Sequence, residues 1–210
     1  MKQILPSIMA QNQKELDGLF NKLGKVTTHF HLDVADGKFV PTKVLQFNLK
    51  LSSAFTYSAH LMVEKPMPFI KKYWNMIDLF LPQVEVFSEP QTYIDFMRGR
   101  GRKVGFAMTP KTSVGSVKRY ISTVDYVLIL TVHPGYYGAP FLPGQLRKIR
   151  QVKKINPNVK IIVDGHMNPQ TIGLARKAGA DMVVVGSYLV NCGDVKKAMR
   201  ELKGSVKIVE

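Results

Sequence analysis

The segment 160-KIIVDGHMNPQTIGLARKAGADMVVV-185 decides the fold class, because it has the pattern of a strand, a helix and a second strand. Lys160–Asp164 and Met182–Val185 are short and apolar, which is typical of parallel strands that are buried on both faces. Asn168–Ala178 lies between them and is followed by Gly179, a residue that commonly ends a helix. The segment therefore predicts a unit of two parallel strands joined by a helix.

The same alternation extends over the rest of the chain. Further apolar segments predict strands at Gln3–Ile8, Thr28–Asp33, Tyr57–Met62, Leu79–Val86, Lys103–Met108 and Tyr126–Leu130. Asn12–Leu23 and Pro143–Ile155 carry apolar residues at helical spacing. Eight strand-then-helix units predict a single (β/α)8 TIM barrel domain over residues 1–210. An open doubly wound sheet is the alternative, but residues 6–10, which follow the first strand, lack the glycine that such a sheet favours.

The composition indicates a cytoplasmic globular protein. The single cysteine, Cys192, fits a reducing compartment, and no apolar run approaches the ~18 residues of a membrane span. The net charge of +15 fits either a basic soluble protein or a nucleic-acid surface. The densest basic cluster, residues 98–103, contains no aromatic residue and precedes the fifth predicted strand, at the end of the barrel away from its mouth. We therefore expect no nucleic acid as a partner.

The carboxyl ends of the predicted strands carry residues that could bind a metal. Catalytic groups of such barrels gather at these ends. His31 and Asp33 are two apart and face the same way, His60 lies near the end of the third strand, and Asp164 ends the seventh. Two imidazoles and two carboxylates form a ligand set for Zn, Mn, Co or Fe. His29 shares the face of His31 but lies deeper, so we interpret it as a packing residue.

Glycine-rich segments near the same mouth predict an anion site. Gly186-Ser187 follows the eighth strand, and residues 135–138 follow the sixth. Glycine lets backbone N–H groups approach a phosphate, and barrels of this class often bind phosphate in their last loops. His133 and His166 lie on loops near the mouth and remain candidates.

At these residues the sequence resembles the ribulose-phosphate 3-epimerase family. The matching segments are Pro6-Ser7-Ile8, residues 31–37 (HLDVADG), Phe39-Val40-Pro41, residues 60–63 (HLMV), Thr131-Val132, Pro134-Gly135, Val163-Asp164-Gly165 and Gly186-Ser187. They follow the order and spacing of the family from Pro6 to Ser187, and residues 31–41 are the most specific.

The resemblance implies a TIM barrel isomerase with one bound divalent metal ion. It implies that the metal ligands are His31, Asp33, His60 and Asp164, and that Asp33 and Asp164 are also the catalytic acid–base pair. It assigns contacts with the substrate or its phosphate to Ser7, His60, Gly135, Tyr136, Tyr137, Gly138, Gly165, His166, Gly186 and Ser187. The implied reaction moves a proton at C3 of a ketose phosphate, most simply between D-ribulose 5-phosphate and D-xylulose 5-phosphate of the pentose phosphate pathway.

Several positions depart from the family pattern. Ala35 and Leu130 replace methionines, Phe87 replaces a histidine, and His166 replaces a glycine. The family loop Gly-Phe-Gly-Gly-Gln is replaced by Gly135-Tyr136-Tyr137-Gly138-Ala139, so it is changed at Tyr136, Tyr137 and Ala139. These changes concern the rim of the site, so an epimerase of another ketose phosphate, such as allulose 6-phosphate, is an alternative.

Two other classes of function are weighed against an epimerase. A decarboxylase or aldolase would need a lysine near the barrel mouth, and the predicted strand ends offer none. An inactive relative that serves as a binding protein would not need all four ligand positions. We expect a phosphorylated ketose as ligand, a homo-oligomer, and no membrane partner.

Overall fold

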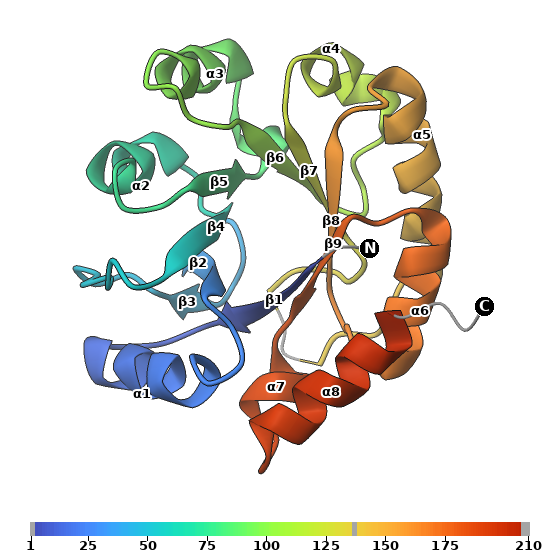
Figure 1. The fold of residues 1–210 in the computed structure, drawn as a ribbon. Coiled ribbons are helices and arrows are strands. Elements are labelled where there is room, and N and C mark those ends of the chain that lie inside the picture. Colours follow the sequence, from blue (N-terminus) through green and yellow to red (C-terminus); the bar gives the residue numbers. More distant parts are fainter. Residues whose placement is uncertain (1–2, 136–137, 207–210) are drawn as a thin grey trace.

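The computed structural model describes residues 3–135 and 138–206 as parallel strands surrounded by helices (Figure 1). The parallel strands follow the spatial order β5-β4-β2-β1-β9-β8-β7-β6. Their bounds are β1 Gln3–Ile8, β2 His29–Asp36, β4 Thr56–Met62, β5 Leu79–Pro82, β6 Gly105–Met108, β7 Tyr126–Leu130, β8 Lys160–Asp164 and β9 Met182–Val185. A parallel bridge between Gln83 and Ala107 joins the two ends of this order. The predicted (β/α)8 barrel is thus confirmed.

Helices cover the outside of the barrel (Figure 1). Their bounds are α1 Gln13–Leu23, α2 Pro66–Tyr73, α3 Pro90–Arg98, α4 Lys118–Ile121, α5 Arg147–Ile155, α6 Pro169–Ala178, α7 Ser187–Val190 and α8 Val195–Val206, with short 3-10 turns at Val84–Val86, Gly115–Val117 and Pro143–Leu146. Asn168 caps α6 in a reciprocal capping box, and Gly179 ends it in the left-handed conformation. In the described part, none of the helices has the combined length and apolarity needed to cross a membrane.

Four strands, β1, β7, β8 and β9, have the predicted bounds, and the other four need correction. β2 and β4 begin one residue away from the prediction, at His29 and Thr56, and β6 begins at Gly105 rather than Lys103. β2 continues past Asp33 to Asp36, because it also pairs with the short antiparallel strand β3, Lys43–Val44. The strand predicted at Leu79–Val86 ends at Pro82, which has no N–H to donate to a neighbouring strand, and the chain then forms a 3-10 turn.

The interior of the barrel is divided into a polar and an apolar part. On β2 and β4, alternate residues point inward, and these include His31, Asp33, Ser58 and His60. A separate apolar cluster comes chiefly from the other strands and contains Leu5, Leu79, Leu81, Ala107, Leu128, Leu130, Ile162 and Val184. The polar residues are therefore held against a rigid apolar wall.

Candidate functional site

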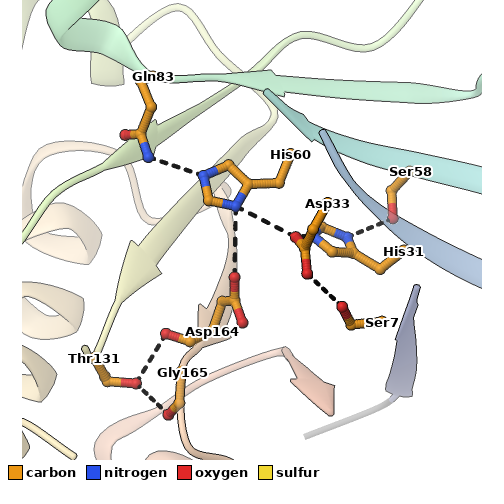
Figure 2. Close-up of polar contacts among 9 residues, drawn as sticks. All are labelled: Ser7, His31, Asp33, Ser58, His60, Gln83, Thr131, Asp164 and Gly165. Atoms are coloured by element: carbon orange, nitrogen blue, oxygen red, sulfur yellow. Dashed lines mark hydrogen bonds and ion pairs between the residues drawn. The ribbon is translucent and has the colours of Figure 1, made fainter. Parts of the chain in front are cut away.

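The four predicted ligands, which come from β2, β4 and β8, meet inside the barrel toward the carboxyl ends of its strands (Figure 2). The register between β2 and β4 explains why three of these residues lie together. Asp33 pairs with His60 across the two strands, and His31 is two residues from Asp33 on the same face. Asp164 is the last residue of β8. One ligand atom from each of the four residues lies within 4.8 Å of all the others.

The spacing of these atoms fits a divalent metal. Asp33 Oδ1 lies 3.5 Å from His31 Nε2 and 3.5 Å from His60 Nδ1, and His60 Nδ1 lies 3.5 Å from Asp164 Oδ2. A tetrahedral ion with bonds of 2.0–2.1 Å separates its ligands by roughly 3.3–3.4 Å. His31 Nε2, Asp33 Oδ1 and His60 Nδ1 are buried and have no hydrogen-bond partner. Buried polar atoms are rarely left without a partner, so the donor set fits a metal centre.

The remaining ring nitrogens of the two histidines are hydrogen-bonded. His31 Nδ1 lies 2.9 Å from Ser58 Oγ. Gln83 contacts His60 Nε2 at 2.8 Å (Figure 2). The amide of Gln83 is assigned by its neighbours: its nitrogen donates to Glu85 Oε2 and to the Ala107 carbonyl, and its oxygen accepts from His60 Nε2–H. His60 Nδ1 is then free to bind a metal.

Burial and charge shift the pKa values of the two histidines in opposite directions. Burial lowers the pKa of His31 to about 4, although the charge of Asp33 opposes this shift. Burial would also lower the pKa of His60, but the carboxyl groups of Asp164 and Asp33, each 3.5 Å from its Nδ1, raise it to about 9. His31 therefore presents a neutral ring, whereas His60 must release a proton when it binds a metal.

The pKa values of the two carboxyl groups also diverge. Burial favours the neutral form of Asp33, but its contact with His60, the electrostatic influence of the two neighbouring histidines and a hydrogen bond from Ser7 lower its pKa overall. For Asp164, burial and the charge of Asp33 raise the pKa despite the contact with His60. The environment thus favours ionisation of Asp33 over ionisation of Asp164.

A cavity of about 150 Å³ opens above the ligands. Asp33 and Asp164 line it, with side chains 11% and 15% exposed, whereas the side chains of His31 and His60 are 0% and 1% exposed and lie behind them. The carboxylates can therefore reach a ligand in the cavity. The predicted contact of His60 with substrate stays a prediction.

Most residues of the predicted phosphate site line the same cavity. They are Ser7, Gly135, Gly138, Gly165, His166, Gly186 and Ser187, whereas Tyr136 and Tyr137 lie outside the described residues. Gly165 and His166 both have positive φ, +120° and +54°. The His166 ring contacts the Ala139 carbonyl at 3.2 Å, which connects the loops that follow β7 and β8.

The departures from the family pattern fall in different places. Leu130 and Ala139 line the cavity, and Ala35 packs behind it against Met62. Phe87 stacks on Tyr93, away from the cavity lining, with 5.7 Å between ring centroids.

Sequence reasoning missed several polar residues that support the site. Gln83 and Ser58 contact the ligand histidines, and Thr131 Oγ1 lies within hydrogen-bond distance of the carbonyl oxygens of Asp164 and Gly165, at 2.9 and 2.8 Å. Polar residue types at inward-facing strand positions were the signal that could have identified Ser58. Gln83 follows β5 in sequence, and only closure of the barrel brings it to His60.

The barrel resembles solved structures with which it shares little sequence. A 3-hexulose-6-phosphate synthase superimposes with a TM-score of 0.67 at 14% identity, covering 99% of this chain and 100% of the other. Orotidine 5'-monophosphate decarboxylase from Sulfolobus solfataricus gives 0.67 at 12% identity, with 99% and 100% covered. At these identities the likeness shows the barrel fold alone.

The sequence comparisons are more specific. Ribulose-phosphate 3-epimerase of Methanocaldococcus jannaschii is 33% identical over 182 residues, which cover 83% of this chain and 77% of that protein. The enzyme of that name from Bacillus subtilis is 29% identical over 216 residues, covering 98% and 100%. The profile of the ribulose-phosphate 3 epimerase family matches residues 3–190, and this span includes all four clustered ligands. The chain therefore belongs to the ribulose-phosphate 3 epimerase family.

Proposed function

We propose that this protein is a metal-dependent sugar-phosphate 3-epimerase that interconverts D-ribulose 5-phosphate and D-xylulose 5-phosphate. One observation carries the proposal: Asp33 and Asp164 line one cavity and have pKa values shifted in opposite directions. Membership of an isomerase family agrees with it.

Inversion at C3 requires two groups, one that accepts a proton and one that supplies a proton. The C3 proton of a 2-ketose is acidified by the adjacent carbonyl group. Asp33, ionised, removes the proton from one face, and Asp164, protonated, supplies a proton to the other face. The reverse reaction exchanges these roles. Pairs of titratable groups whose environments push their pKa values apart are typical of such acid–base pairs.

The two histidines would hold the metal together with the two aspartates. A divalent ion bound there would stabilise the negative charge that develops on the substrate oxygens during proton transfer. Ser7 donates a hydrogen bond to Asp33 and thereby stabilises its ionised form. Thr131 holds the backbone at Asp164 and Gly165, which fixes the second carboxyl group at the floor of the cavity.

The rim of the cavity would bind the phosphate. Gly135, Gly138 and Gly186 place backbone without side chains at its lining. Such backbone N–H groups can approach a phosphate closely. The walls formed by Met9, Met62 and Leu130 are apolar and would exclude water from the carbon that reacts.

Isotope exchange tests the proposal. In D2O, ribulose 5-phosphate should give xylulose 5-phosphate with deuterium at C3, detected by NMR. Asp33→Asn and Asp164→Asn should each lower kcat by roughly 10²-fold or more, because each removes one acid–base group. Asp95→Asn, on the exposed outer side of α3, is the charge-matched control and should keep native activity.

The outcomes distinguish an error in the proposed mechanism from an error in the proposed substrate. Turnover without deuterium at C3, or native activity of both active-site variants, would refute proton transfer by this pair. Deuterium at C3 of allulose 6-phosphate but not of the pentulose phosphates would retain the mechanism and correct the substrate.

A further inference from the structure

A chain of hydrogen bonds extends from the ligand His31 toward the amino-terminal end of the barrel. Ser58 Oγ lies 2.9 Å from His31 Nδ1 and 3.2 Å from His29 Nε2. His29 Nδ1 lies 3.0 Å from Thr56 Oγ1, and that hydroxyl lies 3.2 Å from the Thr28 carbonyl oxygen. Ser58 is fully buried, whereas Thr56 is exposed.

The direction of each hydrogen bond in this chain follows from its last member. The Thr28 carbonyl can only accept, so the hydrogen bond between it and the Thr56 hydroxyl uses the single hydroxyl hydrogen of Thr56. Thr56 Oγ1 must then accept from His29 Nδ1–H, which leaves His29 Nε2 as an acceptor. The Ser58 hydroxyl donates to that nitrogen and accepts from His31 Nδ1–H.

The opposite direction leaves at least one of these contacts without a hydrogen. If Thr56 donated to His29, the oxygens of Thr56 and Thr28 would face each other at 3.2 Å with no hydrogen between them. If Ser58 donated to His31, His29 Nε2 would have to supply the hydrogen for the Ser58 contact, and a neutral His29 would then have none for Thr56. Only one direction puts a hydrogen in every contact.

We propose that Ser58 and His29 are positioning residues that hold His31 in its Nδ1–H tautomer, so that His31 Nε2 presents its lone pair to the metal. His31 Nε2 is the buried nitrogen without a partner, and it points to Asp33 Oδ1. Ligand histidines commonly bond through their other nitrogen to a carboxylate, carbonyl or water, which fixes the tautomer. Here a hydroxyl does so, and because a hydroxyl can both donate and accept, it requires His29 to define its direction.

This inference rests on the metal site of the proposed function but not on the substrate. The test is therefore the affinity of the metal-free protein for Co²⁺, measured by competition with a chelator. Ser58→Ala should weaken Co²⁺ binding by about 10- to 100-fold, the usual cost of losing an outer-shell partner. His29→Leu should weaken it in the same direction, because the Ser58 hydroxyl could then turn and donate to His31. Thr56→Ser keeps the hydroxyl and should bind Co²⁺ like the native protein.

The tautomer can also be observed directly. In metal-free protein labelled with ¹⁵N-histidine, long-range ¹H–¹⁵N spectra should show His31 protonated at Nδ1, and Ser58→Ala should mix the two tautomers. Native Co²⁺ affinity in Ser58→Ala would overturn the proposal, even if that variant were less stable. Weaker binding in Ser58→Ala but not in His29→Leu would overturn the role of His29. Expected Co²⁺ affinities without epimerase activity would retain the inference and refute the proposed function.

Discussion

At the scale of single residues, the turn after β8 shows how strictly the backbone is constrained at the site. Gly165 has φ +120°, and a Cβ atom there would come within 2.8 Å of both Val132 methyl groups. The next residue, His166, also has positive φ, which is uncommon for a residue with a side chain. This turn directly follows Asp164. Its backbone conformation and its close approach to Val132 require a glycine at position 165, whether or not Gly165 contacts a substrate.

Alanine substitutions at two glycines should have opposite effects on stability. Gly165→Ala should lower the free energy of unfolding by about 1–3 kcal/mol, the usual cost of a strained backbone conformation. Gly173→Ala, in α6, is the matched control, because no atom outside its own helix lies within 4 Å of its added Cβ. It should raise the free energy of unfolding by roughly 0.5–1 kcal/mol. Urea unfolding measures both, and equal effects of the two substitutions would contradict the strain argument.

At the scale of elements, Asp36 joins the ends of two strands that carry ligands. Its carboxylate accepts hydrogen bonds from the backbone N–H groups of Lys38, Phe39 and Glu64. These contacts connect the end of β2 to the residues that follow β4. Burial alone would raise the pKa of Asp36, but these N–H donors lower it overall.

The lowered pKa gives the stability contributed by Asp36 a defined pH dependence. The contribution should be present above the unfolded pKa of an aspartate, near ~3.9, and be lost as pH falls through the lower folded pKa. Asp36→Asn should therefore lower the free energy of unfolding by about 1 kcal/mol at pH 7, because the group is largely solvated. Urea midpoints at pH 7 and at pH 3 or below should show the difference between native and variant shrinking. A difference that grows on acidification would refute this assignment.

The contact between Gln83 and His60 lies where β5 and β6 meet. Gln83→Leu should leave His60 Nε2–H without an acceptor, lower the free energy of unfolding by about 1–3 kcal/mol and weaken metal binding. Gln91→Leu, on the exposed side of α3, should do neither. Gln83→Glu retains the acceptor for His60 but cannot donate to Ala107, so it should lose stability yet bind Co²⁺ better than Gln83→Leu. Equal Co²⁺ affinity of these two Gln83 variants would argue against this role.

The sequence predicts the bounds of individual strands better than the contacts between strands. β7, β8 and β9 are continuous apolar runs, and their bounds were confirmed because burial on both faces leaves a clear pattern. β2 was predicted to end too early because polar residues at Asp33 and Asp36 resemble the end of a strand. The site ligands were identified through strand ends, whereas Ser58 and Gln83 act through contacts between strands far apart in sequence.

At the scale of the whole molecule, metal binding should stabilise the fold. Three of the ligand atoms are buried without a hydrogen-bond partner, and only the folded chain brings them together around one ion. A ligand that binds only the folded state at about 100 times its Kd adds roughly 2.7 kcal/mol. Purified protein should bind about one divalent ion per chain, and Zn²⁺ added after chelation should raise Tm. An unchanged Tm with one bound ion would mean that the unfolded chain binds the ion equally well, which would contradict a site assembled only by the fold.

The way the barrel closes has a consequence for how the site assembles. The chain forms two sequence-contiguous halves, β1 to β5 and β6 to β9, which meet through the ladder between β1 and β9 and the single bridge from Gln83 to Ala107. The first half carries His31, Asp33 and His60, and the second carries Asp164. A bound ion would therefore act as a cross-brace between the halves. Separating the halves at the bridge between Gln83 and Ala107 would move Asp164 away from the other three ligands. Retention of the ion would therefore show that the two halves remain in contact.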